Sequence, residues 1–169
     1  MKNKNLQKLV FSALLAALCC VSTMVVQIPS PMGGYVNIGD CFVLLSGFLL
    51  GPVYGTLAAG IGSCLADAFS GYMSYVPATL IIKALMALVC ALIVRTPLNK
   101  YVSRIIAAVS AEAIMVLGYF FWAGVIFGKG FAAAASIPGN LVQAVAGIVL
   151  AYVLVAIFDK IKLTKVIQG

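Results

Sequence analysis

The sequence predicts an all-α membrane protein with six transmembrane helices and with both termini on the cytoplasmic side. Three observations support this fold class. The 169 residues are 64% hydrophobic and only 9% charged, and a mean hydropathy of +1.16 is too high for a soluble core of this size. Glycine, proline and charged residues divide the chain into apolar segments of helical length. Nine of the eleven basic residues stand in three short clusters beside these segments. We therefore expect one integral-membrane domain over residues 1–169.

The boundaries of the six helices follow from the residues that interrupt the apolar segments. Proline is tolerated in the first turn of a helix, where its missing amide proton costs nothing, so Pro52, Pro77 and Pro138 mark helix starts. The second helix is short for a crossing that needs about 20 residues. It either extends into the preceding loop or is re-entrant. The predicted helices are Leu6–Ile28, Gly39–Leu50, Pro52–Phe69, Pro77–Val94, Ser103–Phe127 and Pro138–Phe158.

The basic clusters orient these helices, because lysine and arginine are retained on the cytoplasmic side. Six crossings return the C-terminus to the side of the N-terminus, and all three clusters then fall on that side. The outer loops are residues 29–38, 70–76 and 128–137, and their one basic residue is Lys129. The clusters are Lys2, Lys4 and Lys8; Arg95, Lys100 and Arg104; and Lys160, Lys162 and Lys165.

The residue inventory excludes several classes of function. The chain has no histidine, so a Ser-His-Asp triad, a Cys-His dyad and an H-E-x-x-H zinc site are impossible. Its five cysteines are odd in number and lack CxxC spacing, which argues against a disulfide framework or a zinc site. Because the cations lie at membrane boundaries, topology explains them better than nucleic-acid binding does. We expect no enzyme activity and no cofactor.

Lys83 is the one basic residue inside a predicted span. It is the seventh residue of its helix from the outer end, which places it about 9 Å deep. An intramembrane cation is costly unless it is paired or functional. Lys83 therefore either pairs with Asp67, at similar depth on the neighbouring helix, or faces a ligand cavity that opens outward. Both interpretations stay open.

The other three acidic residues have simpler interpretations. Asp40 begins a helix, where we favour capping over contact with a ligand. Asp159 lies among lysines at a helix end and is read as an interfacial charge. Glu112 lies near the middle of the fifth helix, where an ionisable residue would serve as the proton or cation site of a carrier.

Polar and aromatic side chains are concentrated at the outer ends of the helices. Asn140 and Gln143 are three residues apart and share a helix face. Two amides on one face offer donors and acceptors to a flat heterocycle on which aromatic rings can stack. Tyrosines and Trp122 at this depth are also typical of an aromatic belt. Small residues recur every four positions in the second and third helices, for which we favour packing within the chain. They are Gly47, Gly51, Gly55, Ala59 and Ser63.

Four stretches of the chain resemble the S component of an energy-coupling factor (ECF) vitamin transporter. The most specific is the glycine-rich stretch from Tyr35 to Tyr72. The others are the small-residue motif ALLAA from Ala13 to Ala17, the run PATLIIK that ends at Lys83, and PGNLVQ from Pro138 to Gln143. The resemblance covers nearly the whole chain.

This resemblance implies capture of a water-soluble vitamin or precursor from outside a bacterial plasma membrane, followed by delivery to an ATP-driven module. The implied partners are a transmembrane coupling subunit, which Ala13 and Ala17 would contact, and two cytoplasmic ATPases. Riboflavin, vitamin B6 and hydroxymethylpyrimidine stay open as ligands, and residues 29–38 are the expected lid. The alternative is a self-sufficient carrier driven by an ion gradient. The implied substrate-binding residues are Tyr35, Asn37, Lys83, Tyr119, Trp122, Asn140 and Gln143.

Overall fold

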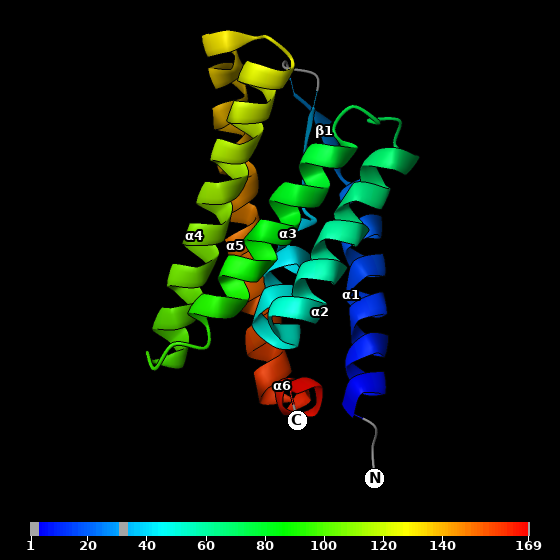
Figure 1. Ribbon diagram of the computed structural model, residues 1–169. Coiled ribbons are helices and arrows are strands. Elements are labelled where there is room, and N and C mark those ends of the chain that lie inside the picture. Colours follow the sequence, from blue (N-terminus) through cyan, green and yellow to red (C-terminus); the bar gives the residue numbers. More distant parts are fainter. Residues whose placement is uncertain (1–3, 31–33, 169) are drawn as a thin grey trace.

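The computed structural model of the chain describes residues 4–30 and 34–168, which form a bundle of long helices with one short β-hairpin (Figure 1). Within these residues, five segments are long and apolar enough to cross a membrane: α1, α2, α3, α4 with η1, and η2 with α5. The mostly helical architecture agrees with the all-α part of the predicted fold class, whereas the sequence predicted six crossing helices and the described residues form five such segments. The elements are α1 (Lys4–Val25), β1 (Gln27–Pro29), β2 (Tyr35–Asn37), α2 (Asp40–Phe69), α3 (Val76–Ile93), α4 (Lys100–Phe121), the π-helical turn η1 (Trp122–Ile126), the 3-10 helix η2 (Gly130–Ser136), α5 (Ile137–Lys160) and α6 (Leu163–Gln168).

The two helices predicted on either side of Gly51 are the two arms of α2. Gly51 has φ 81° and ψ −175°, a backbone conformation that glycine adopts without steric cost. Pro52 then starts the second arm with a φ suited to a helix. The arms lie against each other as a hairpin (Figure 1). Their approach is so close that a Cβ atom at Gly55 would be 2.4 Å from the carbonyl oxygen of Ser46.

The first arm of α2, residues 40–50, is the enclosed centre of the bundle. At 1.5 Å per residue it is about 16 Å long, roughly half of a 30 Å hydrocarbon core. Its side chains are almost all buried, with Val43, Leu44 and Leu45 fully so. The antiparallel β1–β2 hairpin leads into this arm and pairs Gln27 with Asn37. The part of the predicted lid at residues 31–33 lies outside the described residues.

The small residues of α2 pack within the chain. A Cβ atom at Gly47 would be 2.8 Å from both the Ala87 carbonyl oxygen and the Cys90 Cβ atom of α3. A Cβ atom at Gly62 would be 2.4 Å from the carbonyl oxygen of Ala16 on α1. Such contacts let helix backbones approach closely. The expectation of intramolecular packing is thus confirmed for Gly47 and Gly55.

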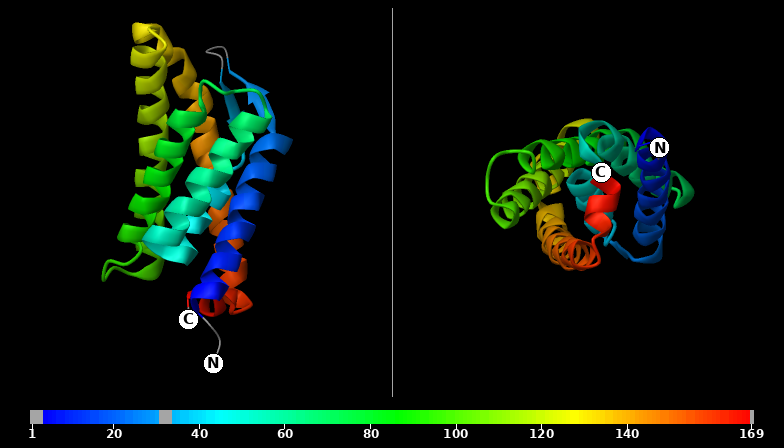
Figure 2. Two further views of the ribbon diagram at one scale, coloured as in Figure 1. Left: turned by 45° about the vertical axis from the view of Figure 1, so that its right-hand side comes forward. Right: turned by 90° about the horizontal axis from the view of Figure 1, so that it is seen from below.

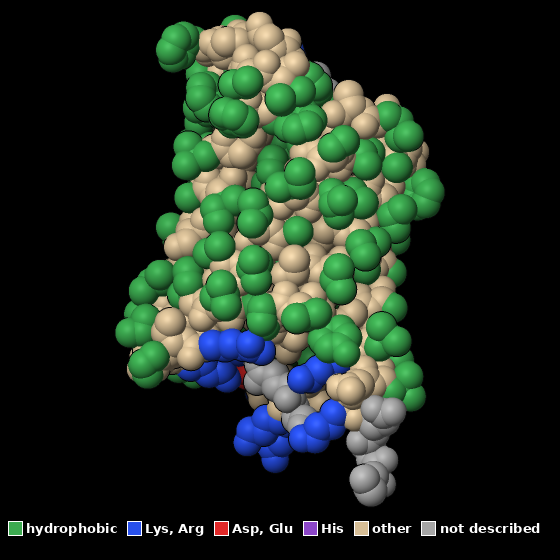
Figure 3. Space-filling view, in the orientation of Figure 1, with side chains coloured by type: hydrophobic (Ala, Val, Ile, Leu, Met, Phe, Trp, Pro, Cys, Tyr) green, Lys and Arg blue, Asp and Glu red, His purple; other side chains and the backbone are tan. Residues whose placement is uncertain are grey.

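Basic side chains gather at one end of the visible surface, while the sides are apolar (Figure 3). The start of α1, the helix α6 and the α3–α4 connection lie at this same end (Figures 1 and 2). There Asp159 of α5 binds two cations of α4: its Oδ2 atom is 2.6 Å from Nη1 of Arg104 and 2.8 Å from Nζ of Lys100. The predicted interfacial aspartate is therefore an ion-paired link between two helices.

Candidate ligand-binding site

A cavity of about 50 Å³ lies beneath the β-hairpin, toward the end of the bundle opposite the basic side chains. Its walls come from α1, β2, the second arm of α2, α3, α4, η1, η2 and α5. Trp122 does not line it and instead lies edge-on to Phe127, with ring centroids 6.3 Å apart. The other six candidate residues do line it, namely Tyr35, Asn37, Lys83, Tyr119, Asn140 and Gln143.

Lys83 pairs with Asp40 rather than with Asp67. The Lys83 ammonium contacts the Asp40 Oδ1 atom, and the two side chains are 3% and 1% exposed. Of the two interpretations left open for Lys83, the pair with Asp67 is wrong, because the enclosed first arm of α2 brings its own N-terminal aspartate against α3. Lys83 also lines the cavity. The favoured capping role of Asp40 is also wrong, since the N-terminus of α2 has no side-chain cap. Asp40 still complements the positive end of that helix.

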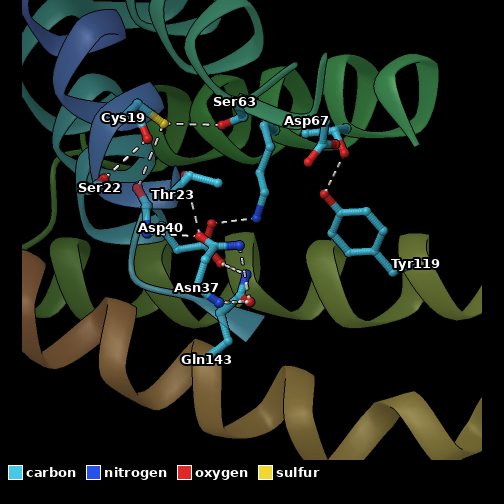
Figure 4. Close-up of polar contacts among 12 residues, drawn as sticks. Cys19, Ser22, Thr23, Asn37, Asp40, Ser63, Asp67, Tyr119 and Gln143 are labelled. Carbon is cyan, nitrogen blue, oxygen red and sulfur yellow. Dashed lines mark hydrogen bonds and ion pairs between the residues drawn. The ribbon is translucent and has the colours of Figure 1, made fainter. Parts of the chain in front are cut away.

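Gln143 connects three elements through both ends of its amide (Figure 4). Its Nε2 atom donates to Asp40 Oδ2 at 2.6 Å. Its Oε1 atom accepts from the backbone N–H of Asn37 at 2.9 Å and from the Asn37 side chain at 3.4 Å. The Asn37 Oδ1 atom in turn accepts from the Gly39 N–H at 2.8 Å. This network fixes β2 and the start of α2 against α5.

Tyr35 and Tyr119 use their hydroxyl groups within the outer part of the site. Tyr35 donates to the Asp67 carboxylate, and burial together with this carboxylate raises the pKa of the Tyr35 phenol above its usual range. Tyr119 shares a hydrogen bond of 2.9 Å with Thr79, and the Lys83 ammonium lies 5.5 Å from the centre of its ring. Both tyrosines therefore present aromatic surface, with their polar ends already satisfied.

Two buried polar atoms of the cavity residues find no hydrogen-bond partner among the described residues. They are Oδ2 of Asp67 and Nδ2 of Asn140. Buried polar groups are nearly always paired, and both residues line the cavity. The site thus offers one acceptor and one donor to a small molecule.

Sequence reasoning did not assign seven further polar residues to the cavity wall, namely Thr23, Ser30, Ser63, Asp67, Tyr75, Thr79 and Ser136. A pattern in the sequence could have found three of them. Ser63 and Asp67 are four residues apart, as are Thr79 and Lys83, so each pair shares one helix face. Two polar pairs at this spacing on neighbouring apolar helices indicate a shared polar interior.

Comparison with known proteins identifies the family of the chain. The sequence model of the family described as "ECF-type riboflavin transporter, S component" matches residues 3–160. The chain belongs to this family. It is therefore a multi-pass membrane protein of vitamin uptake and not an enzyme.

Two relatives resemble this S component over most of their length. An uncharacterised protein of Pyrococcus woesei is 39% identical over 131 residues, which cover 77% of this chain and 86% of the relative. The thiamine precursor transporter HmpT of Lactococcus lactis is 30% identical over 162 residues, which cover 95% of this chain and 92% of the relative.

Solved structures share the fold of this S component. One is described as the S component of a bacterial ECF transporter, with a TM-score of 0.66 over 94% of this chain and 96% of that one. Another is the S component for biotin from an ECF-type transporter, with a TM-score of 0.67 over 100% of this chain and 99% of that one. Each is 20% identical to this sequence, so they support the architecture alone.

Proposed function

We propose that this S component captures a small, neutral heterocycle of the hydroxymethylpyrimidine class and delivers it to an ATP-driven ECF module. The observation that carries the proposal is the pair of unpartnered polar atoms in the cavity, Asp67 Oδ2 and Asn140 Nδ2. An aminopyrimidine carries an amino donor beside a ring-nitrogen acceptor. Asp67 would accept from the amino group and Asn140 would donate to the ring nitrogen.

The size and lining of the cavity favour a single ring over a larger ligand. A cavity of about 50 Å³ must widen even for one ring and much more for the three fused rings and sugar alcohol of riboflavin. Tyr75 and Tyr119 line it and supply aromatic surface for stacking. Similarity to a thiamine precursor transporter supports the same ligand class, and vitamin B6 is the next candidate by size.

The proposed topology places the cavity on the outer side and the basic end in the cytoplasm. Retention of lysine and arginine on the cytoplasmic side supports this direction, as does the gathering of basic side chains at one end (Figure 3). Ala13 and Ala17 are exposed on α1, whereas Ala16 packs against α2. The exposed pair is therefore free to contact the coupling subunit.

Ligand titration of the purified chain in detergent tests the ligand class. Trp122 is the single tryptophan of the chain, and its neighbour Ala123 lines the cavity, so we expect its fluorescence to change on binding. We expect hydroxymethylpyrimidine to bind more tightly than pyridoxine, and pyridoxine more tightly than riboflavin. Tighter binding of riboflavin would overturn the proposed ligand class.

Uptake in liposomes tests the mode of transport. We expect accumulation of hydroxymethylpyrimidine only when the coupling subunit, both ATPases and ATP are present. Uptake by the chain alone under a proton gradient would instead support the self-sufficient carrier.

A further inference from the structure

Glu112 is a buried acid to which no described residue donates a hydrogen bond. It lies on α4 (Lys100–Phe121), is 3% exposed, and neither of its carboxyl oxygens has a donor among the described residues. The same face of α4 buries Ala108, Ala111 and Met115. An ionised carboxylate in such surroundings is costly unless another group compensates its charge.

Asp40 and Glu112 approach each other across a glycine of α5. A Cβ atom at Gly147 would be 2.9 Å from the Asp40 Cβ atom and 3.0 Å from the Glu112 Oε1 atom. Only a residue without a side chain leaves both carboxyl groups room at this point. The Asp40 carboxyl already binds Lys83 and Gln143.

The charges around Glu112 do not balance if both carboxyl groups are ionised. From α3 the groups that act on it are the Lys83 cation and the Cys90 thiol, and from α2 the Asp40 carboxylate. The acid of α5, Asp159, is bound by Lys100 and Arg104 at the basic end. One lysine therefore faces two carboxyl groups. Because Lys83 is in contact with Asp40, the uncompensated group is Glu112.

We propose that Glu112 is a proton-binding site, and that Lys83, Asp40 and protonated Glu112 form a neutral cluster beneath the ligand cavity. With a proton on Glu112, the positive charge of Lys83 cancels the negative charge of Asp40, and the net charge of the cluster is zero. Loss of this proton, which passes to water, leaves a second carboxylate beside Asp40. That charge competes for Lys83 and disturbs the contacts by which Asp40 holds Gln143.

The effect of this proton on ligand binding follows from the contact between Asp40 and Gln143, and it rests on the proposed function. Gln143 and Asn37 form part of the cavity wall, and both depend on Asp40 through the same hydrogen-bonded chain. Ligand affinity is therefore expected to fall once Glu112 releases its proton. For a single linked proton the loss is about tenfold per pH unit above that point.

Infrared difference spectroscopy of the purified chain, without any ligand, tests the proton site itself. We expect a carbonyl-stretch band of a protonated carboxyl group that shifts in heavy water and disappears in Glu112→Gln. Asp67→Asn, which removes the buried acid in the outer part of the cavity wall, should keep the band. Absence of the band in the unmodified chain, or its persistence in Glu112→Gln, would overturn the proposal. Glu112→Met is a second neutral variant if Glu112→Gln does not fold.

Titration with hydroxymethylpyrimidine across pH tests the coupling. The unmodified chain is expected to lose affinity at alkaline pH, whereas Glu112→Gln, which is neutral at every pH, should change by less than about twofold. Equal pH dependence in both proteins would overturn the coupling. Failure of hydroxymethylpyrimidine to bind at neutral pH would instead count against the proposed ligand and leave the infrared result to decide the proton site.

Discussion

Substitution of the two amides of α5 by alanine should separate ligand contact from structural support. Asn140 has an unpartnered Nδ2 atom in the cavity wall, so Asn140→Ala removes a group that no described residue uses. Gln143 joins Asp40 and Asn37 through both ends of its side chain. Gln143→Ala therefore removes a group that holds the site together. We expect Asn140→Ala to weaken binding alone and Gln143→Ala to lower both binding and stability.

The expected magnitudes follow from the hydrogen bonds. A single neutral hydrogen bond contributes about 1 kcal/mol, so Asn140→Ala should raise the Kd of hydroxymethylpyrimidine by roughly five- to tenfold. Gln143→Ala leaves the Oδ2 atom of Asp40 and the backbone N–H of Asn37 each without the partner that Gln143 provides. An unsatisfied buried group costs about 1–3 kcal/mol, so the two together destabilise the fold by roughly 2–6 kcal/mol.

Fluorescence titration of Trp122 and thermal unfolding in detergent measure these two effects on the same protein samples. Asn140→Ala should unfold at the temperature of the unmodified chain, and Gln143→Ala should unfold several degrees lower. The reasoning is refuted if Asn140→Ala binds with unchanged affinity, or if Gln143→Ala unfolds at the unmodified temperature.

Three further substitutions test other parts of the structure. Ala13→Trp should leave ligand binding intact but abolish uptake by the complete complex, whereas Leu18→Trp, about 140° away around α1, should support uptake; equal uptake by both would remove the docking assignment. Lys83→Met leaves the buried Asp40 without its cation, at a cost of about 3–5 kcal/mol, and should lower the thermal unfolding temperature; adding Asp40→Leu should recover part of the loss, and no recovery would speak against the pair. Gly147→Val places methyl groups where Asp40 and Glu112 meet and should reduce both affinity and thermal stability; unchanged values of both would speak against that close approach.

The long helices could be predicted from the sequence, because the residues that determine them are close together in the chain. Apolar length predicted the helices, and Gly51 followed by Pro52 predicted the break between the arms of α2. The β-hairpin and the 3-10 helix η2 were not predicted, because the composition of each, apart from a few residues, is that of a loop. Their conformations depend on the bundle that they contact.

Part of the candidate site was also accessible from sequence, because residues on one helix face can be grouped by spacing. Asn140 with Gln143 is such a case, and both line the cavity. The partner of Lys83 was not accessible in this way. The similar depth of Asp67 and Lys83 on neighbouring helices favoured Asp67 as the partner of Lys83. The actual partner is Asp40, because the short first arm of α2 reaches far enough into the bundle to bring it against Lys83. That depth is set by packing among α1, α3 and α5, which no local pattern encodes.

The half-length first arm of α2 has a consequence for how the chain enters the membrane. Residues 40–50 reach only about half of the way across the hydrocarbon core and begin with a charged residue, so this arm cannot hold a transmembrane position alone. It must enter together with the second arm as one helical hairpin about Gly51, and it becomes shielded from lipid only when α3 and α5 arrive. The cation that pairs with Asp40 and the amide that anchors it come from those later helices, so the cavity is completed only when α5 has been synthesised and inserted.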